Sequence, residues 1–335
     1  MANSVIRITQ SDLATTAALG VNLTDAEIAA KLEAGPNQLT AKGSVSVSGV
    51  CVDNSGNIYV SDLDRHTILK IDEGGRVSLY AGEDGTSGDN GTLANVPALD
   101  ARFNAPVGLA CDNSGNIYVA DSGNNQIRVI RDGYVSVLAG DGGGVAGHTD
   151  GVGGAAKFDT PWDVDVDPSG TVYVADSGND SIRRIKDGTV YTYAGDTAGD
   201  GENVATTAKT LFDNPLGVAC DANGNVFVCD TANYKIKKIT PRGWVYLHSG
   251  SGVAGKALGT TAFNCQYNEL RHCSVDASGN LYVIDANAAN GTRLVKVNTE
   301  GIPAVINDFN GTTYNDENTA VAFSPAGKMF VVVYD

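Results

Sequence analysis

One stretch of the sequence, residues 106–140, decides the fold. It reads Pro106-Val-Gly-Leu-Ala-Cys-Asp-Asn-Ser-Gly-Asn-Ile-Tyr-Val-Ala-Asp-Ser-Gly-Asn-Asn-Gln-Ile-Arg-Val-Ile-Arg-Asp-Gly-Tyr-Val-Ser-Val-Leu-Ala-Gly140. It contains four short apolar runs, separated by turn signals at residues 112–115, 122–125 and 132–133. This pattern predicts one four-stranded antiparallel unit. Because the runs show no clean alternation of apolar and polar residues, we expect both faces of the sheet to be covered by neighbours.

The same unit recurs along the chain. The aspartate that ends its second apolar run returns at intervals of 50 to 59 residues, at Asp62, Asp121, Asp176, Asp230, Asp285 and Asp335. Four short strands in each repeat, glycine-rich turns and no helical periodicity inside the repeats predict an all-β fold, a six-bladed β-propeller with four-stranded blades.

The two ends of the sequence suggest how the ring closes. Residues 319–335 supply only two strands of the last repeat, whereas residues 4–10 resemble the third strands of other repeats. We therefore expect residues 1–10 to form the closing strand of the last blade, which removes exposed sheet edges.

Residues 11–38 depart from the repeat. Thr24 and Glu27 have the spacing of a helix capping box. This segment therefore predicts a small inserted helical hairpin, and residues 39–335 form the propeller domain.

Three further segments resemble a known family. They are Val-Tyr-Val-Ala-Asp-Ser-Gly-Asn-Asp-Ser-Ile-Arg-Arg-Ile at 172–185, Ala-Arg-Phe-Asn-Ala-Pro at 101–106 and Ala-Lys-Phe-Asp-Thr-Pro at 156–161. They look like the repeats of NHL-repeat β-propellers, and the resemblance runs from about residue 48 to the end. It implies the propeller fold but no single function, because the family includes a peptide-amidating lyase, RNA-binding modules, sensor domains and adhesive scaffolds.

The charge of the chain argues against nucleic acid as a partner. The net charge is −16, with 39 acidic and 23 basic residues, so phosphate backbones are repelled unless a local basic patch exists. Arg183, Arg184, Lys186 and the lysines of residues 235–238 lie in third strands, where we expect them to reach solvent at a blade edge.

Six cysteines are too few for a dense disulfide framework in a chain of 335 residues. We expect free thiols, most of them packed in strands as small apolar groups. Cys265 and Cys273 are the pair near enough in sequence to suggest a bridge. The strand cysteines are Cys51, Cys111, Cys220 and Cys229.

The sequence shows no secretory signal and no apolar run of membrane-spanning length. We expect a soluble protein without membrane insertion. A virion or an extracellular location is the favoured interpretation, and the cytoplasm is the alternative.

The first strands should line a central channel, where blade three is unusual. Asp163 and Asp165 lie two residues apart, hence on the same side of a strand. With His272 they are the strongest catalytic or metal-binding candidates. The chain has four histidines, too few near the channel for a histidine metal ring. We therefore expect no catalytic site, no metal and no cofactor, with calcium in the acidic loops at 83–89 and 196–200 as the alternative.

These observations favour a non-enzymatic structural or binding propeller with a protein partner in a larger assembly, such as a virion decoration, a fibre component or a surface recognition protein. The first alternative is a metal-assisted hydrolase or lyase at the channel. The second is a glycan- or peptide-binding module that uses the face formed by the long connections between blades.

Four residues are candidates for binding. Trp162 and Tyr267 offer aromatic surfaces near the long connections. Ile28 and Leu32 share one face of the expected hairpin through their four-residue spacing. That face either packs on the propeller or docks a partner.

Overall fold

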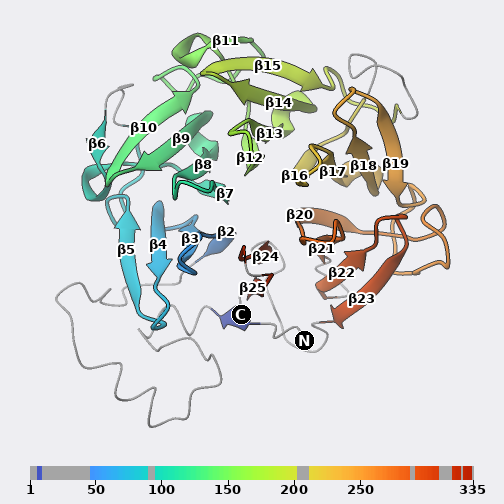
Figure 1. Ribbon diagram of the computed structural model, residues 1–335. Helices are drawn as coiled ribbons and strands as arrows, with labels where there is room; N and C mark the ends of the chain where they lie inside the picture. The colour runs from blue at the N-terminus through green and yellow to red at the C-terminus, as the bar shows by residue number, and fades with distance from the viewer. Residues whose placement is uncertain are drawn as a thin grey trace.

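The structure, a computed structural model, describes residues 6–9, 46–89, 95–201, 211–286, 291–308, 319–325 and 327–333. It is an all-β propeller, as predicted. Six separate sheets stand in a ring around a central axis (Figure 1). Five of them are blades of four or five strands, and the sixth sheet has three described strands.

The blades follow one another along the chain. Blade 1 consists of β2 (Val47–Val52), β3 (Ile58–Asp62), β4 (Thr67–Ile71) and β5 (Val77–Ala81). Blade 2 consists of β7 (Pro106–Cys111), β8 (Ile117–Asp121), β9 (Gln126–Arg131) and β10 (Tyr134–Ala139), with β6 (Val96–Pro97) outside β10. Blade 3 consists of β12 (Pro161–Val166), β13 (Val172–Asp176), β14 (Ser181–Lys186) and β15 (Thr189–Ala194), with β11 (Gly151–Val152) outside β15.

Blade 4 consists of β16 (Pro215–Cys220), β17 (Val226–Asp230), β18 (Lys235–Ile239) and β19 (Val245–Ser249). Blade 5 consists of β20 (Glu269–Val275), β21 (Leu281–Ala286), β22 (Arg293–Val297) and β23 (Pro303–Asp308). Short 3-10 turns η1 (Ala98–Asp100), η2 (Ser122–Asn124), η3 (Gly153–Ala155), η4 (Ser177–Asn179) and η6 (Thr231–Asn233) lie between strands.

The quoted stretch forms the four consecutive antiparallel strands that its pattern predicts, β7 to β10. Its first turn follows from Asp112, whose Oδ1 accepts the backbone N–H groups of Ser114 and Asn116. Gly115 completes the turn at a φ of 83°, a conformation that glycine adopts without strain. The equivalent turns of all blades lie at one end of the ring, which we call the short-turn face. The long connections between blades lie at the other end, the long-loop face.

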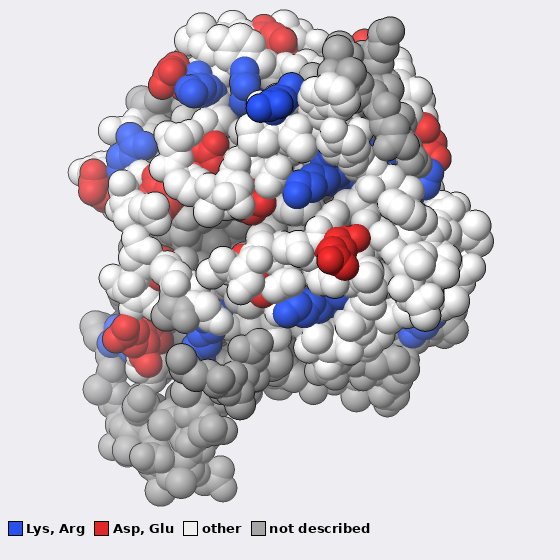
Figure 2. All heavy atoms as spheres, turned by 45° about the vertical axis from the view of Figure 1, so that its right-hand side comes forward, with Lys and Arg blue, Asp and Glu red and all other residues white. Residues whose placement is uncertain are grey.

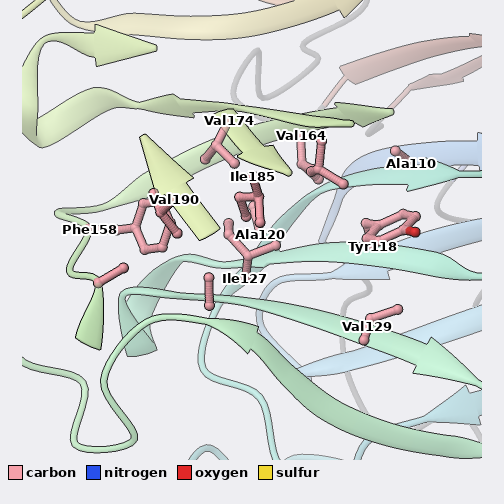
Figure 3. Close-up of a cluster of buried hydrophobic side chains, with 13 residues drawn as sticks. Ala110, Tyr118, Ala120, Ile127, Val129, Phe158, Val164, Val174, Ile185 and Val190 are labelled. Carbon is pink, nitrogen blue, oxygen red and sulfur yellow. The ribbon is translucent and has the colours of Figure 1, made fainter. Parts of the chain in front are cut away.

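The core lies between neighbouring blades. In the cluster drawn in Figure 3, Ala120 and Ile127 of blade 2 lie near Ile185 and Val190 of blade 3 and near Phe158, which precedes β12. Both faces of each sheet are therefore covered, which explains why the strands do not alternate between apolar and polar residues.

The sixth sheet departs from the prediction of a four-stranded blade. β24 (Thr319–Phe323) and β25 (Met329–Val333) are antiparallel, but β1 (Ile6–Thr9) runs parallel to β25. A third strand of a blade would run antiparallel to the second, so six equal four-stranded blades are not what the structure shows. That residues 1–10 close the last blade stays a prediction. The hairpin expected at 11–38, with Ile28 and Leu32, lies outside the described residues.

Buried ion pairs attach the long connections to the blades. Asp176, at the end of β13, accepts the Asp159 backbone N–H and a 2.7 Å contact from Arg183 of β14. Arg183 also donates to the Lys157 carbonyl and lies over the Phe158 ring, 5.3 Å from its centroid. The pairs equivalent to Asp176 with Arg183 are Asp121 with Arg128 and Asp230 with Lys237. In blade 5 Asp285 pairs with Arg293, which lies directly opposite it on the third strand.

The expectation that the basic residues of the third strands reach solvent is therefore wrong for some of them. Arg183 and Lys237 are fully buried, because they turn inward toward the aspartate and the long connection. Lys186, at the end of its strand, is exposed as expected. On the side drawn in Figure 2, the Lys and Arg side chains are spread among Asp and Glu and form no single patch.

One pair of cysteines contradicts the expectation of free thiols. Cys51 of β2 and Cys111 of β7 form a disulfide, with their Cα atoms 5.8 Å apart. Their strands are inner strands of adjacent blades, which brings together residues that lie 60 positions apart. Cys265 and Cys273 are free and buried, so the bridge considered for them is not formed.

Candidate functional site

The inner strands of all six sheets enclose the channel. Its middle holds a cavity of about 100 Å³, lined on different sides by Asp165, His272 and the Cys51–Cys111 pair. Toward the long-loop face lies a small recess lined by Trp162, Asp163, Arg271 and His272, among others. The sequence analysis placed Asp163, Asp165 and His272 near the channel, and the structure brings Asp163 and His272 together there.

The two aspartates of β12 bind the backbone of the neighbouring blade. Oδ2 of Asp163 accepts the Val218 N–H at 3.1 Å, and Oδ2 of Asp165 accepts the Cys220 N–H at 2.7 Å. The Cys220 thiol also donates to Asp165. Because both carboxyl groups bridge β12 to β16, they take part in holding two inner strands together.

Burial governs the protonation states of Asp163, Asp165 and His272. It raises the pKa of Asp163 to about 8 and lowers the pKa of His272 to about 4. Nδ1 of His272 accepts the Val321 N–H at 3.4 Å, and Nε2 lies 3.6 Å from Oδ1 of Asp163. At neutral pH the two side chains therefore face each other as a neutral imidazole and a protonated carboxyl group. Burial raises the pKa of Asp165 as well, to about 6.

We expect Asp163 to make the free energy of unfolding depend on pH. A carboxyl group whose pKa is raised in the folded chain stabilises the fold while protonated, and this contribution is lost as the pH rises through about 8. Asp163→Asn cannot ionise, so the parent should lose stability relative to this variant between about pH 5 and about pH 9, with a slope of up to about 1.4 kcal/mol per pH unit. Urea unfolding at both pH values measures the difference. Equal pH dependence in the two proteins would contradict the assignment.

The two predicted aromatic binding residues differ in their exposure to solvent. Trp162 is partly buried beside the recess at the long-loop end of the channel. Tyr267 is fully buried, and its hydroxyl group lies 2.8 Å from the Ser249 hydroxyl, so it cannot present a stacking surface to a ligand. The assignment of Tyr267 as a binding residue is therefore wrong.

The sequence contained the signal that explains Tyr267. It lies 18 residues before Asp285, the same distance that separates Phe158 from Asp176. The Gly255 N–H donates to the Tyr267 carbonyl, just as the Gly147 N–H donates to the Phe158 carbonyl. Tyr267 is thus the blade 5 form of the buried aromatic residue that fixes each long connection.

The acidic loops considered for calcium use their carboxylates in ion pairs. Asp84 binds Arg65, Glu83 binds Arg102, and Asp200 binds Lys235. Within the described ranges, no group of three or more His, Cys, Asp or Glu side chains is placed to hold a metal ion.

Among the residues that the structure describes, none belongs to a helix long and apolar enough to cross a membrane.

Comparison with known proteins agrees with the repeat. Residues 46–71, 103–130 and 158–185 match the NHL repeat. The chain carries NHL repeats. This NHL chain is 30% identical over 253 residues to NHL repeat-containing protein 2 from Homo sapiens, an alignment that covers 67% of the chain. The chain spans 34% of that relative's length.

Solved structures share the NHL propeller's fold at low sequence identity. A gluconolactonase from Xanthomonas campestris aligns with a TM-score of 0.57 and 16% identity, over 86% of this chain and 82% of its own. A chain from a nidogen–laminin complex aligns with a TM-score of 0.54 and 15% identity, over 89% and 92%. At these identities the likeness concerns the fold alone, which hosts both an enzyme and a protein-binding module.

Proposed function

We propose that this NHL propeller is a binding module that holds a protein partner on its long-loop face and performs no chemical step. The observation that carries the proposal is a set of exposed apolar side chains on the long connections. Val145 and Val253 are 54% and 55% exposed, and Phe263 is 62% exposed. Apolar side chains that a domain leaves exposed on its loops can contact a protein partner.

The positions of these valines support a shared role. Each lies two residues before a glycine whose N–H binds the carbonyl of a buried aromatic residue, Gly147 with Phe158 and Gly255 with Tyr267. The two valines therefore occupy the same place in two repeats, on loops whose ends are fixed by the core. A rigid scaffold that presents apolar groups on fixed loops loses little entropy on binding.

Two further features shape the expected partner. Trp162 adds an aromatic side chain at the centre of the same face. The net charge of −16 favours a partner segment that combines apolar with basic residues, because charge complementarity speeds association. Nothing in the fold or in the relatives named above points to a virion, and the proposal includes none.

A chemical role is the second candidate, and the Asp163–His272 contact of 3.6 Å is what favours it. A buried carboxyl group with a pKa near neutrality beside an imidazole can serve in acid–base chemistry. Against it, both oxygens of Asp163 already accept backbone N–H groups, from Val164 and Val218. Hydrolysis assays on a panel of lactones and esters, with added divalent ions, test it: turnover that disappears in Asp163→Asn would support this candidate.

The binding proposal predicts which substitutions weaken the partner. Peptides selected from a displayed random library on the parent chain should lose affinity at least about tenfold when Val145 and Val253 are both replaced by aspartate, because two apolar contacts are replaced by charges. Val305→Asp is the matched control, on an exposed residue of β23, away from the long connections. Titration by fluorescence anisotropy measures the affinities. Peptides that bind the double variant and the parent equally would refute the proposed face.

A further inference from the structure

The largest cavity of the three described lies at the opposite end of the channel, on the short-turn face. It has a volume of about 490 Å³, within the range of small-ligand pockets. Turns of blades 1, 2, 4 and 5 and of the sixth sheet line it, and it shares Val52, Cys111 and Phe323 with the cavity of the channel. We call it the short-turn funnel. Nothing in the proposed function uses this end of the molecule.

A tyrosine hydroxyl group completes the turn beside this face in three blades. Oδ2 of the turn aspartate accepts two donors in each of them, the amide of an asparagine and the hydroxyl group of a tyrosine on the second strand. The tyrosine–aspartate pairs are Tyr59 with Asp53 at 3.1 Å, Tyr118 with Asp112 at 3.1 Å and Tyr282 with Asp276 at 3.3 Å. The amide donors are Asn57, Asn116 and Asn280.

Blade 4 breaks this repeat, because Phe227 occupies the place of the tyrosine. It pairs with Ala219 in the register in which Tyr118 pairs with Ala110. Within the described residues, Oδ2 of Asp221 therefore has one donor, the Asn225 amide at 2.7 Å. Asp221 is only 8% exposed, and both Asp221 and Phe227 line the funnel. Oδ2 of Asp221 thus lacks the second donor that a tyrosine hydroxyl group supplies in blades 1, 2 and 5.

The surroundings of this position offer further hydrogen-bonding groups. The Lys238 ammonium lies over the Phe227 ring, 5.2 Å from its centroid, and it has no carboxylate partner among the described residues. Asn223 and Ser278 also line the funnel. The wall therefore combines a carboxylate acceptor, a charged donor and neutral amide and hydroxyl groups.

We propose that the short-turn funnel binds a small neutral polyhydroxylated molecule, such as a sugar. One hydroxyl group of the ligand donates to Oδ2 of Asp221 from the side of the funnel. Lys238 donates to a second ligand oxygen. The side chains of Val275 and Phe323, which line the funnel and are partly exposed, contact the carbon atoms of the ligand. A carboxylate with an open acceptor site and a neighbouring ammonium suit hydroxyl groups, which both donate and accept.

The test restores the missing hydroxyl group. In Phe227→Tyr the protein itself supplies the donor to Asp221, so ligand affinity should fall at least about tenfold, as expected when a hydrogen bond to a charged group is lost. Because the same contact exists in three other blades, this variant should unfold at the same or a higher temperature. The probes are glucose, galactose, maltose and sorbitol, titrated into the full chain and followed by NMR shifts of the backbone amides.

Two controls separate the funnel from general effects. Lys238→Met should also weaken binding, because it removes the second donor but keeps most of the side-chain volume. Tyr59→Phe removes the equivalent hydroxyl group beside Asp53, which does not line the funnel, so it should leave binding unchanged. Two outcomes would overturn the proposal. In the first, none of the four probes shifts the amide signals of residues 221–225 in the parent at concentrations up to about 50 mM, well above a millimolar dissociation constant. In the second, Phe227→Tyr binds the probes as tightly as the parent does.

Discussion

Replacing Arg183 by leucine should lower the free energy of unfolding by about 3–5 kcal/mol, the usual cost of removing one partner from a buried ion pair. Arg183 and Asp176 are both fully buried, with 2.7 Å between Nη1 and Oδ2. The variant would also lose the bond to the Lys157 carbonyl and the ion pair with Asp150.

The size of this loss should depend on pH. Burial raises the pKa of Asp176 to about 6, and Arg183 is the main influence that lowers it. Without the arginine the pKa of Asp176 rises further. The variant is therefore destabilised most at pH values above this pKa and least at pH values where the carboxyl group of Asp176 is protonated. Urea unfolding at about pH 5 and about pH 8 should therefore show the larger loss at the higher pH.

Two companion variants make the result specific to the pair. Lys186→Leu removes a positive charge from the exposed end of the same strand and should change the stability by less than about 0.5 kcal/mol. Adding Asp176→Asn to Arg183→Leu removes the unpaired carboxyl group and should recover part of the loss at about pH 8. A loss below about 1 kcal/mol for Arg183→Leu would show that the pair contributes little to the fold.

Gly108→Ala should destabilise the protein by about 3 kcal/mol or more, the upper range for overpacked sites. Gly108 lies on β7, where the backbone of β12 in the next blade approaches closely. A Cβ at this position would lie 2.5 Å from Cα of Asp163 and 2.9 Å from the Val164 nitrogen, and it would also overlap Oδ1 of Asp163. Backbone atoms of an inner strand cannot move aside without shifting a whole blade.

Gly143→Ala is the matched control for Gly108→Ala. A Cβ at Gly143 would meet its nearest neighbours at 3.9 and 4.0 Å, ordinary contact distances, and its φ is not positive. This variant should unfold within about 0.5 kcal/mol of the parent. Thermal unfolding of both variants measures the difference. Similar midpoints for Gly108→Ala and the parent would mean that the inner strands can separate without cost.

The parts of the fold that local chemistry determines could be predicted from the sequence. The turn of Asp112 and Gly115 depends on residues within four positions of each other, and the periodic aspartates marked every blade. The disulfide of Cys51 with Cys111 could not be predicted in this way. It requires knowing that inner strands of successive blades lie side by side, which no local pattern states.

The candidate sites also have parts that the sequence could predict and parts that it could not. Asp163 and His272 were identified as residues that break the repeat, and they do meet at the channel. Arg183 was misjudged, because an arginine in a strand usually reaches water and only its partner Asp176, seven residues earlier, shows that it turns inward. The change from tyrosine to Phe227 was visible in the sequence, but its meaning required the hydroxyl–carboxylate contacts of the other blades.

The register of the sixth sheet bears on how the protein is made. β1 pairs Ile6 with Phe330, so the first described strand finds its place only beside one of the last. In each of the five blades the four main strands are joined by local hairpins, so they can pair as the chain leaves the ribosome. β1 cannot pair with β25 until translation has passed residue 333. During that interval its backbone N–H and C=O groups can pair with a strand of another chain.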